Sequence, residues 1–269
     1  MELSLDKIQG FLPKSHPWAE SILCFDTIDS TNTHAKALAS AGAPHGTVLL
    51  ANHQTGGRGR LGRRFHSPAG SGMYLSVILR PNCPPAELMH LTCAAGCAMC
   101  DAVEEAARIR PGIKWINDLV WNKQKLGGIL AELSINPNNG LVDYAIVGIG
   151  INCTQKTADF PSEIREIATS LHMITGRIID RNRLAAAMIL SLFRMSETLL
   201  REKNAIMAHY RADCVTLGKE VCVHRFDEIC HGIAVNIDDD GALVVRFADG
   251  HHETISAGEV SIRGMYGYV

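Results

Sequence analysis

Residues 56–64 form the part of the sequence best suited to chemistry, because this short stretch contains four arginines and four glycines. Arginine presents a planar fork of N–H donors that matches carboxylates and phosphates. Glycine lets the backbone approach an anion closely and change conformation cheaply. The combination suits a mobile loop that binds an anion, and composition alone leaves a solvated surface loop and an arginine–glycine nucleic-acid segment open as alternatives. No Gly-Lys-Ser/Thr follows and no helical pattern begins here, which argues against a nucleotide P-loop or a dinucleotide fingerprint.

Two strands and a helix are expected to position this loop. The strands are expected at 47–51 and 73–79, one on each side of it. Residues 29–32, Asp-Ser-Thr-Asn, precede an alanine-rich stretch closed by Gly42, which predicts a helix with a hydroxyl or amide N-cap and a glycine stop. Further along, long helices are expected from about residue 85 to 108 and through 184–199. A set of strands and tight turns at 113–152 lies between them.

The sequence changes character after about Val215. Short strands separated by Asp-Gly turns are expected at 221–223, 233–237, 242–247 and 260–262. This pattern predicts a small all-β domain behind a larger N-terminal one. We therefore place a catalytic domain at 1–214 and a second domain at 215–269.

Composition excludes several classes of protein. Hydrophobic residues make up 46% and charged residues 20%, as in ordinary globular proteins, and no segment approaches the roughly 18 apolar residues of a spanning helix. The first residues lack the basic and apolar run of a secretion signal. The net charge of −2 gives no general affinity for nucleic acid or acidic lipid. We therefore expect a cytoplasmic protein with no membrane partner.

The nine cysteines are an odd number scattered along the chain, unlike the cysteines of a small secreted disulfide scaffold. Cys93, Cys97 and Cys100 lie at helical spacing among alanines, where a metal site is the alternative to buried thiols. Thiolate metal sites usually pair their ligands on turns, and no fourth ligand is evident. The spacing therefore favours buried apolar thiols.

A series of motifs resembles the biotin protein ligases, in one order over about residues 29–263. The motifs are Ser30-Thr31-Asn32, Gln54, Gly57-Arg58-Gly59-Arg60, Ser67-Pro68, Lys114-Trp115-Ile116-Asn117-Asp118, Lys125-Leu126-Gly127-Gly128-Ile129-Leu130 and Gly148-Ile149-Gly150-Ile151-Asn152. The last motif alone is weak evidence. The Gly-Arg-Gly-Arg loop followed by Lys-Trp-x-Asn-Asp and Lys-Leu-x-Gly-Ile-Leu is specific.

The resemblance implies an α/β (α+β) catalytic domain, with a mixed sheet and helices like those of class II aminoacyl-tRNA synthetases, and a small SH3-like β-barrel at the C-terminus. It implies an ATP- and Mg-dependent ligase that forms biotinyl-5′-AMP from biotin and ATP. The biotin then passes to a lysine of a biotin carboxyl carrier protein. Longer relatives carry a DNA-binding helix-turn-helix first, and only 29 residues precede Ser30 here, so we expect a short form without DNA binding. A homodimer is compatible with the sequence.

For biotin, the resemblance implies four contacts before the loop. Ser30, Thr31 and Asn32 match the helix start that meets biotin, and N-capping is the plain structural role for such residues. Gln54 matches a residue near the ureido ring, where a side-chain amide can both donate and accept.

For the reacting groups, the resemblance implies three loop residues and a lysine. Arg58, Gly59 and Arg60 match the loop that closes over the biotin carboxylate and the α-phosphate. Lys125 matches a lysine that contacts the activated carboxyl and phosphate, although a lone lysine in a turn is ordinarily solvated. Arg60 and Lys125 are therefore the expected catalytic cations.

For ATP and Mg, the resemblance implies a contribution from Asn117 and Asp118, for which turn formation is the structural alternative. Asp118 is the candidate metal ligand and a candidate catalytic residue. Asn152 is a candidate for the nucleotide pocket, together with the two loop arginines.

Two departures from the family pattern stand out. Ile116 replaces the usual proline after Lys-Trp, and Phe65-His66 replaces a Trp-containing pair, so the cover over the adenylate is expected to pack differently. The nearest rival, lipoate protein ligase, usually has Arg-Arg before a glycine triplet and His-Asp, which is not found here. A non-catalytic biotin sensor or adaptor is the rival from another class. The presence of both loop arginines, Lys125 and Asp118 favours catalysis over binding alone.

Overall fold

The computed structural model of the chain describes residues 2–225, 228–256 and 261–264. A seven-stranded mixed sheet forms the body of the molecule, in the strand order β1-β2-β3-β7-β6-β5-β4. Its strands are β1 (Ile22–Ile28), β2 (Val48–Gln54), β3 (Gly72–Leu79), β4 (Gly112–Lys114), β5 (Asp118–Trp121), β6 (Gln124–Ile135) and β7 (Val142–Asn152). β1 and β2 are parallel, and every other neighbouring pair in this sheet is antiparallel.

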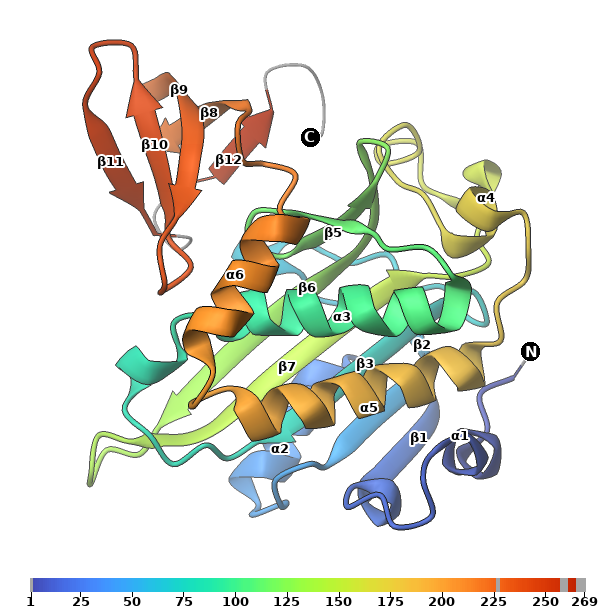
Figure 1. The fold of residues 1–269 in the computed structure, drawn as a ribbon. Coiled ribbons are helices and arrows are strands. Elements are labelled where there is room, and N and C mark those ends of the chain that lie inside the picture. The colour runs from blue at the N-terminus through green and yellow to red at the C-terminus, as the bar shows by residue number, and fades with distance from the viewer. Residues whose placement is uncertain (1, 226–227, 257–260, 265–269) are drawn as a thin grey trace.

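Helices cover both faces of this sheet (Figure 1). The α-helices are α1 (Leu5–Phe11), α2 (Thr31–Ser40), α3 (Leu91–Ala107), α4 (Leu171–Thr175), α5 (Arg181–Thr198) and α6 (Lys203–Asp213). Single 3-10 turns are η1 (Ala19–Ser21), η2 (Arg60–Gly62), η3 (Pro85–Leu88) and η4 (Thr157–Asp159). The helices α3, α5 and α6 share the main core on one face, and α2 packs Ala35 and Ala39 into a separate cluster on the other. The strands between them are near-continuous apolar runs because both of their faces are buried.

The sequence places most of these elements correctly. The helix expected after residues 29–32 is α2, and the long helix through 184–199 is α5. The expected helix from residue 85 is wrong at its start, since residues 85–88 form η3 and α3 begins only at Leu91. His90, between the two, has a ψ of 3° that departs from α-helical geometry, and its buried ring bonds the carbonyl of Leu199.

The C-terminal residues form a second, all-antiparallel sheet in the order β11-β10-β9-β8-β12. Its strands are β8 (Glu220–Arg225), β9 (Glu228–Ile237), β10 (Leu243–Phe247), β11 (His252–Ile255) and β12 (Ser261–Gly264). The fold class is confirmed as a mixed α/β body with a small β-rich C-terminal domain. Val260, from the strand expected at 260–262, lies outside the described residues. The boundary between 214 and 215 stays a prediction, with α6 ending at Asp213.

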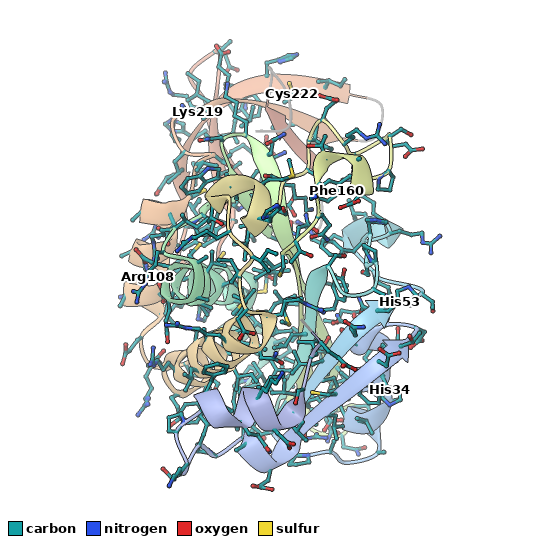
Figure 2. The ribbon with its side chains drawn as sticks, turned by 90° about the vertical axis from the view of Figure 1, so that its right-hand side faces the viewer. His34, His53, Arg108, Phe160, Lys219 and Cys222 are labelled. Atoms are coloured by element: carbon teal, nitrogen blue, oxygen red, sulfur yellow. The ribbon has the colours of Figure 1, made fainter. Side chains whose placement is uncertain are left out.

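The two parts of the chain are in direct contact. Figure 2 shows Lys219 and Cys222 at the top of the view, above Phe160, His53 and His34 of the larger domain. The turn between β9 and β10 reaches back to the larger domain, where the indole Nε1 of Trp115 donates to the carbonyl of Gly241 at 2.8 Å. Arg211 of α6 donates to the carbonyl of Ile237 at 2.6 Å. Both domains therefore contribute side chains to one apolar core.

The prediction for the cysteines of α3 is confirmed. Cys93, Cys97 and Cys100 are free and buried within the core, and burial raises the pKa of each thiol. Among the described residues, no group of three or more His, Cys, Asp or Glu side chains could hold a metal ion. The helices of the described ranges include none long and apolar enough to cross a membrane.

Candidate active site

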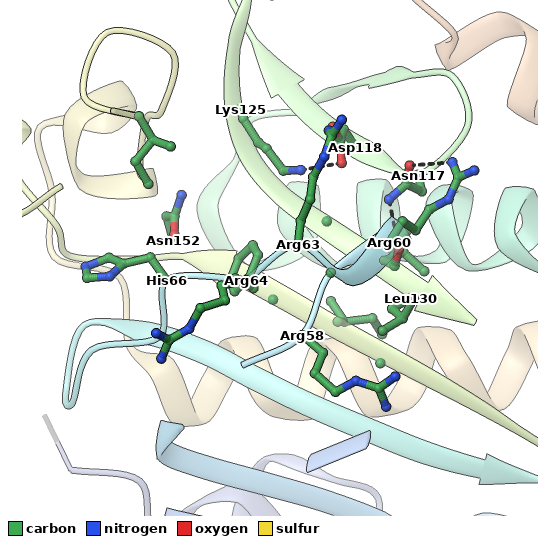
Figure 3. Close-up of a pocket in the computed structure, with 18 of the residues that line it drawn as sticks. Arg58, Arg60, Arg63, Arg64, His66, Asn117, Asp118, Lys125, Leu130 and Asn152 are labelled. Carbon is green, nitrogen blue, oxygen red and sulfur yellow. Dashed lines mark hydrogen bonds and ion pairs between the residues drawn. The ribbon is translucent and has the colours of Figure 1, made fainter. Parts of the chain in front are cut away.

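A single cavity of about 730 Å³ brings the predicted site residues together (Figure 3). It lies between the start of α2, the end of β2, residues 56–64 (the arginine loop), the β4–β5 turn and the adjoining parts of β6 and β7. The eleven predicted residues that line it are Ser30, Thr31, Asn32, Gln54, Arg58, Gly59, Arg60, Asn117, Asp118, Lys125 and Asn152. Its volume suits a small ligand.

The charge of the cavity is strongly biased. The cationic side chains that line it are Arg58, Arg60, Arg63, Arg64, Lys114 and Lys125. Asp118 is the single carboxylate among the described residues of the lining. The cavity is therefore suited to an anion, although the whole chain is slightly acidic.

Amide and hydroxyl groups occupy one end of the cavity. Gln54, at the end of β2, accepts hydrogen bonds on Oε1 from the backbone N–H of Thr31 at 2.8 Å and from the Thr31 hydroxyl at 3.1 Å. The Gln54 Nε2 donates to Ser67 Oγ at 3.0 Å, which fixes the orientation of the side-chain amide. Ser30 caps α2, since its Oγ accepts from the backbone N–H of Thr33 at 3.5 Å. The N-cap role expected for this segment is thus confirmed.

Asn32 packs closely against β7, and the protein supplies hydrogen-bond partners to both ends of its amide. Its Nδ2 donates to the carbonyl of Leu130 at 3.2 Å and to Oε2 of Glu132 at 3.0 Å. Its Oδ1 accepts from Ser76 Oγ at 2.6 Å. A Cβ on Gly148 would lie 1.8 Å from that Oδ1, so only glycine leaves room for this side chain. Asn32 therefore supports the site, and its expected contact with biotin stays a prediction.

Lys125 and Asp118 form an ion pair near the middle of the cavity. Their Nζ and Oδ1 atoms are 2.5 Å apart, across the antiparallel strands β5 and β6. The backbone of Lys125 is anchored on its other side, because its N–H donates to the carbonyl of Ile167 at 2.7 Å and its carbonyl accepts from Thr169 at 2.8 Å. A flexible lysine is thus fixed at both ends.

Arg60 reaches the same region from the loop. Its Nη1 donates to Oδ1 of Asn117 at 3.1 Å, and the Asn117 Nδ2 donates to the carbonyl of Ile129 at 3.0 Å. Burial lowers the pKa of the Arg60 guanidinium, while Asp118 acts in the opposite direction. A partly desolvated arginine that lines the same cavity as Lys125 is well placed to stabilise negative charge on a ligand.

The arginine loop is folded more tightly than its composition predicts. The backbone N–H of Gly59 donates to Arg63 at 2.7 Å, and that of Phe65 donates to Gly57 at 3.0 Å. The segment Arg60–Gly62 forms η2 at the tip. Arg58 turns outward to Glu132, with 3.3 Å between its guanidinium and Oε1. The expectation that the loop is mobile without ligand stays a prediction.

An apolar wall closes the remaining end of the cavity. The residues that form it are Phe65, Phe160, Ile164, Ile167 and Ala168. Phe65 lies directly against Gly150, where an added Cβ would be 2.3 Å from the ring. Asn152 is buried beside this wall and donates from Nδ2 to the carbonyl of Thr169 at 2.9 Å. The Phe-His departure therefore places Phe65 over the sheet, while the departure at Ile116 coincides with a cis Trp115–Ile116 peptide bond.

Sequence reasoning missed several residues of the site. Lys114 was noted only as part of a motif, yet it is buried and lines the cavity. Glu132 contacts Asn32, Lys36 and Arg58, and the signal that could have found it is a lone acid in the apolar strand β6. Ser76 gave no such signal, because a serine in a buried strand is unremarkable before its partners are known.

Comparison with known proteins gives two family matches. A model described as "Biotin/lipoate A/B protein ligase family" matches residues 24–152, and one described as "Biotin protein ligase C terminal domain" matches residues 216–263. The bifunctional ligase/repressor BirA of Bacillus subtilis is 34% identical over 245 residues, which span 91% of this chain and 75% of that protein. The biotin--[acetyl-CoA-carboxylase] ligase of Mycobacterium tuberculosis is 36% identical over 240 residues, 86% of this chain and 85% of that one.

Solved structures give the same result. The biotin protein ligase from Aquifex aeolicus in complex with biotin and ATP is 31% identical to this chain. It superposes with a TM-score of 0.74, over 90% of this chain and 98% of that one. The biotin protein ligase from Leishmania major in complex with biotinyl-5-AMP is 27% identical, with a TM-score of 0.57 over 88% of this chain and 98% of that one.

Proposed function

This chain belongs to the biotin protein ligase family, and on that premise we propose that its cavity carries out both steps of an ATP-dependent ligation. Biotin and ATP first give biotinyl-5′-AMP and pyrophosphate, and the biotinyl group then passes to a lysine of a carrier protein. The observation that carries this proposal is the arrangement of the cavity. Neutral amide and hydroxyl groups lie at one end, and Arg60, Lys125 and Asp118 lie next to them in the same space.

The neutral end suits the ureido ring of biotin. A ureido group has two N–H donors and one carbonyl acceptor, so it needs fixed groups of both kinds. Gln54 and the hydroxyl of Thr31 supply them, and their mutual hydrogen bonds hold them in place before the ligand arrives. Preorganised groups of this type lose little conformational entropy on binding.

The cationic region suits the reacting groups. In the first step a carboxylate oxygen of biotin attacks the α-phosphorus, the bond from that phosphorus to the bridging oxygen breaks, and pyrophosphate leaves. Negative charge gathers on the α-phosphate oxygens during this step. Arg60 and Lys125 place fixed positive charge there, and no nucleophile from the protein is required.

A magnesium ion would be held mainly by the phosphates of ATP. Mg²⁺ typically binds one or two carboxylates together with substrate phosphates and water, and Asp118 is the carboxylate that the described lining offers. The ion would neutralise charge on the leaving pyrophosphate. Asn117 and Asp118 stand side by side at the start of β5, where Asn117 orients Arg60 and Asp118 orients Lys125.

In the second step the ε-amine of an acceptor lysine attacks the carbonyl carbon of the mixed anhydride. AMP leaves with the former anhydride oxygen, and the new amide nitrogen loses a proton. The acceptor is a folded biotin carboxyl carrier domain of a biotin-dependent carboxylase, since one positioned lysine must reach the enclosed carbonyl. The names of the relatives, which include acetyl-CoA-carboxylase ligases, support this class of acceptor.

The proposal is tested by incubating the protein with biotin, MgATP and a purified biotin carboxyl carrier domain. Covalent biotin should appear on the carrier, detected by intact mass, with ATP and biotin both required. Excess lipoate should compete poorly, because its ring lacks the N–H donors that Gln54 and Thr31 are arranged to meet. Transfer of lipoyl but not biotinyl groups would overturn the assignment. A carrier whose acceptor lysine is replaced by arginine serves as the control.

A further inference from the structure

Two polar side chains, those of Asn152 and His66, lie at the apolar end of the cavity. Phe65 packs against Gly150 of β7, and Asn152 is two residues further along the strand, so its side chain leaves the same face of the sheet. His66 follows Phe65 in the chain, and Figure 3 draws its ring next to Asn152. Both side chains line the cavity. The apolar end therefore combines aromatic and aliphatic surface with two side chains that can form hydrogen bonds.

The proposed reaction leaves this end of the cavity for the base of ATP. The ureido ring of biotin is assigned to the neutral end, and the α-phosphate to Arg60 and Lys125. The base is attached to that phosphate through the ribose, so it extends away from biotin toward the apolar wall. A purine has two flat faces, and bases stack readily on aromatic side chains such as Phe160.

The amide of Asn152 has one N–H to offer a ligand. Its Nδ2 is 2.9 Å from the carbonyl oxygen of Thr169, which can only accept, so this side of the amide is the NH₂ group. Its Oδ1 accepts from Nε2 of Gln155 at 3.3 Å. Within the described residues, Thr169 takes one of the two protons of the NH₂ group, and the second is left for a ligand. A ring nitrogen of a purine is an acceptor that matches it.

The ring of His66 offers the complementary acceptor. Its Nε2 is shielded from water and has no hydrogen-bond partner in the described parts of the chain, whereas most buried polar atoms have one. The last torsion of a histidine side chain is broad, so a modest rotation of the ring turns this nitrogen toward a ligand in the cavity. A neutral imidazole has one nitrogen that accepts a hydrogen bond. The residues of the apolar wall have no polar side-chain atom, so His66 is the acceptor that the side chains of this end supply.

We propose that His66 is a specificity-determining residue that accepts a hydrogen bond from the 6-amino group of adenine, while Asn152 donates to a neighbouring ring nitrogen. This role rests on the proposed function and adds the source of base selectivity. Adenine has an amino donor with ring acceptors on either side of it, so one acceptor and one donor from the protein match its edge. Guanine has a carbonyl in place of that amino group, and its oxygen would face the acceptor of His66 without a proton between them.

The test combines one change in the protein with one change in the nucleotide. Biotin-dependent pyrophosphate exchange is measured with ATP and with purine riboside triphosphate, in which hydrogen replaces the 6-amino group. The wild-type protein should have a KM about tenfold lower for ATP, as expected for one buried hydrogen bond. His66→Phe keeps a flat ring without nitrogen and should have nearly equal KM values for the two nucleotides. An unchanged preference for ATP in His66→Phe would overturn the proposal.

Rescue by a conservative variant separates a hydrogen bond from simple packing. His66→Gln carries an amide oxygen at about the reach of the histidine Nε2, so it should keep most of the preference for ATP over purine riboside triphosphate. If His66→Gln and His66→Phe lose this preference equally, the ring of His66 only packs against the base and the proposal is wrong.

Two further readings complete the experiment. His53→Phe is the matched control, since His53 is half-buried on β2 outside the described lining of the cavity, and it should keep the wild-type preference for ATP. The KM for biotin should be unchanged in every variant, because the ureido ring lies at the other end. Equal KM values for the two nucleotides in the wild-type protein would refute the role of His66 alone. A wild-type protein without biotin-dependent exchange would instead refute the proposed function itself.

Discussion

Lys125 is positioned by an irregularity in the strand that carries it. Asp118 pairs with Gly128 across β5 and β6, but after Leu119 the pairing shifts register and Val120 lies opposite Lys125. A bulge of this kind turns side chains relative to a regular ladder and commonly lies beside an active site. Here it coincides with a lysine whose Nζ reaches Asp118 from the same hairpin. The Lys-Leu-x-Gly-Ile-Leu motif therefore forms part of β6 and also orients the Lys125 ammonium toward Asp118.

We expect Lys125→Ala and Arg60→Ala each to lower the rate of adenylate formation by tens- to thousands-fold. Both side chains are partly buried in the cavity, and removing one partner of a desolvated charge pair typically costs about 2–5 kcal/mol. The measurement is biotin-dependent pyrophosphate exchange at saturating and at low biotin.

Two exposed cations away from the cavity provide matched controls for these variants. Lys7 on α1 and Arg194 on α5 are solvent-exposed, so Lys7→Ala and Arg194→Ala should keep normal exchange rates. Circular dichroism should show all four variants folded. Near-normal rates for both Lys125→Ala and Arg60→Ala would contradict the assignment of the anion site.

The residues that sequence reasoning found are those carried by local motifs. Short motifs contain Arg60, Asn117 and Lys125, and the charged residues of these motifs predicted a site for an anionic ligand. Ser76 and Glu132 are equally close to the site, but only the pairing of β3, β6 and β7 brings them to Asn32. Sequence spacing contains no information on that register. The supporting contacts of the site were therefore beyond prediction.

At the scale of an element, the arginine loop combines internal order with an exposed surface. Its backbone closes on itself through the Gly59–Arg63 and Gly57–Phe65 hydrogen bonds, while the side chain of Leu61 at its tip is 66% exposed. None of residues 58–64 is buried. A segment with few buried contacts opens at low free energy.

We expect trypsin to cleave this loop quickly in the free protein and much more slowly with biotin plus MgATP. Arg58, Arg63 and Arg64 are exposed without ligand, whereas the phosphate of the adenylate would pair with the loop arginines and order it. ATP alone should protect less than both substrates together. Cleavage sites are mapped by mass spectrometry over a time course. The control is cleavage outside residues 58–64, which the ligands should leave unchanged.

Equal cleavage of the loop with and without both ligands would mean that it is not ordered by the adenylate. The catalytic assignment would survive that result, because the mutational test above is independent of loop motion. The account of how the anhydride is shielded from water would not survive it.

Element boundaries were predictable where a terminal residue signals them. Ser30 caps α2 through its hydroxyl, as expected from the sequence. Asp180 caps α5 through its carboxylate, a signal that the sequence-based predictions did not use. The start of α3 was not predictable, because nothing in the composition around His90 reveals its bond to Leu199, 109 residues away. A tertiary contact of that kind overrides local propensity.

At the scale of the whole molecule, the C-terminal domain is tied to the active site through one turn. Asp238 to Gly241 form the β9–β10 turn, in which Asp239 pairs with Arg211 and Asp240 with Lys203, both on α6. The Gly241 carbonyl accepts from the indole of Trp115, which stands two residues before Asn117. The residues on either side of the predicted boundary at 214/215 thus share one apolar core and are joined by hydrogen bonds, one of them at Trp115 close to Asn117.

Gly241 offers a test of this docking, with Gly250 as a matched control. Both are turn glycines of the C-terminal sheet, with φ of +87° and +88°, so alanine costs roughly 1–2 kcal/mol of backbone strain at either position. A Cβ at Gly250 meets nothing within 4 Å, whereas a Cβ at Gly241 would lie 2.8 Å from Cys93 Sγ in α3. Denaturant unfolding should therefore show Gly241→Ala destabilised by about 1–3 kcal/mol more than Gly250→Ala.

Activity distinguishes a loss of docking from a loss of stability alone. Displacement of the turn by Gly241→Ala should pull its carbonyl from Trp115 and raise the KM for ATP several-fold, because Asn117 and Asp118 lie two and three residues after Trp115 and hold Arg60 and Lys125. The KM for biotin should change little, since Gln54 and Thr31 lie at the other end of the cavity. Gly250→Ala should leave both constants unchanged. If the two variants lose the same stability and keep the same KM for ATP, the turn is a passive contact and the C-terminal domain does not position Asn117 and Asp118.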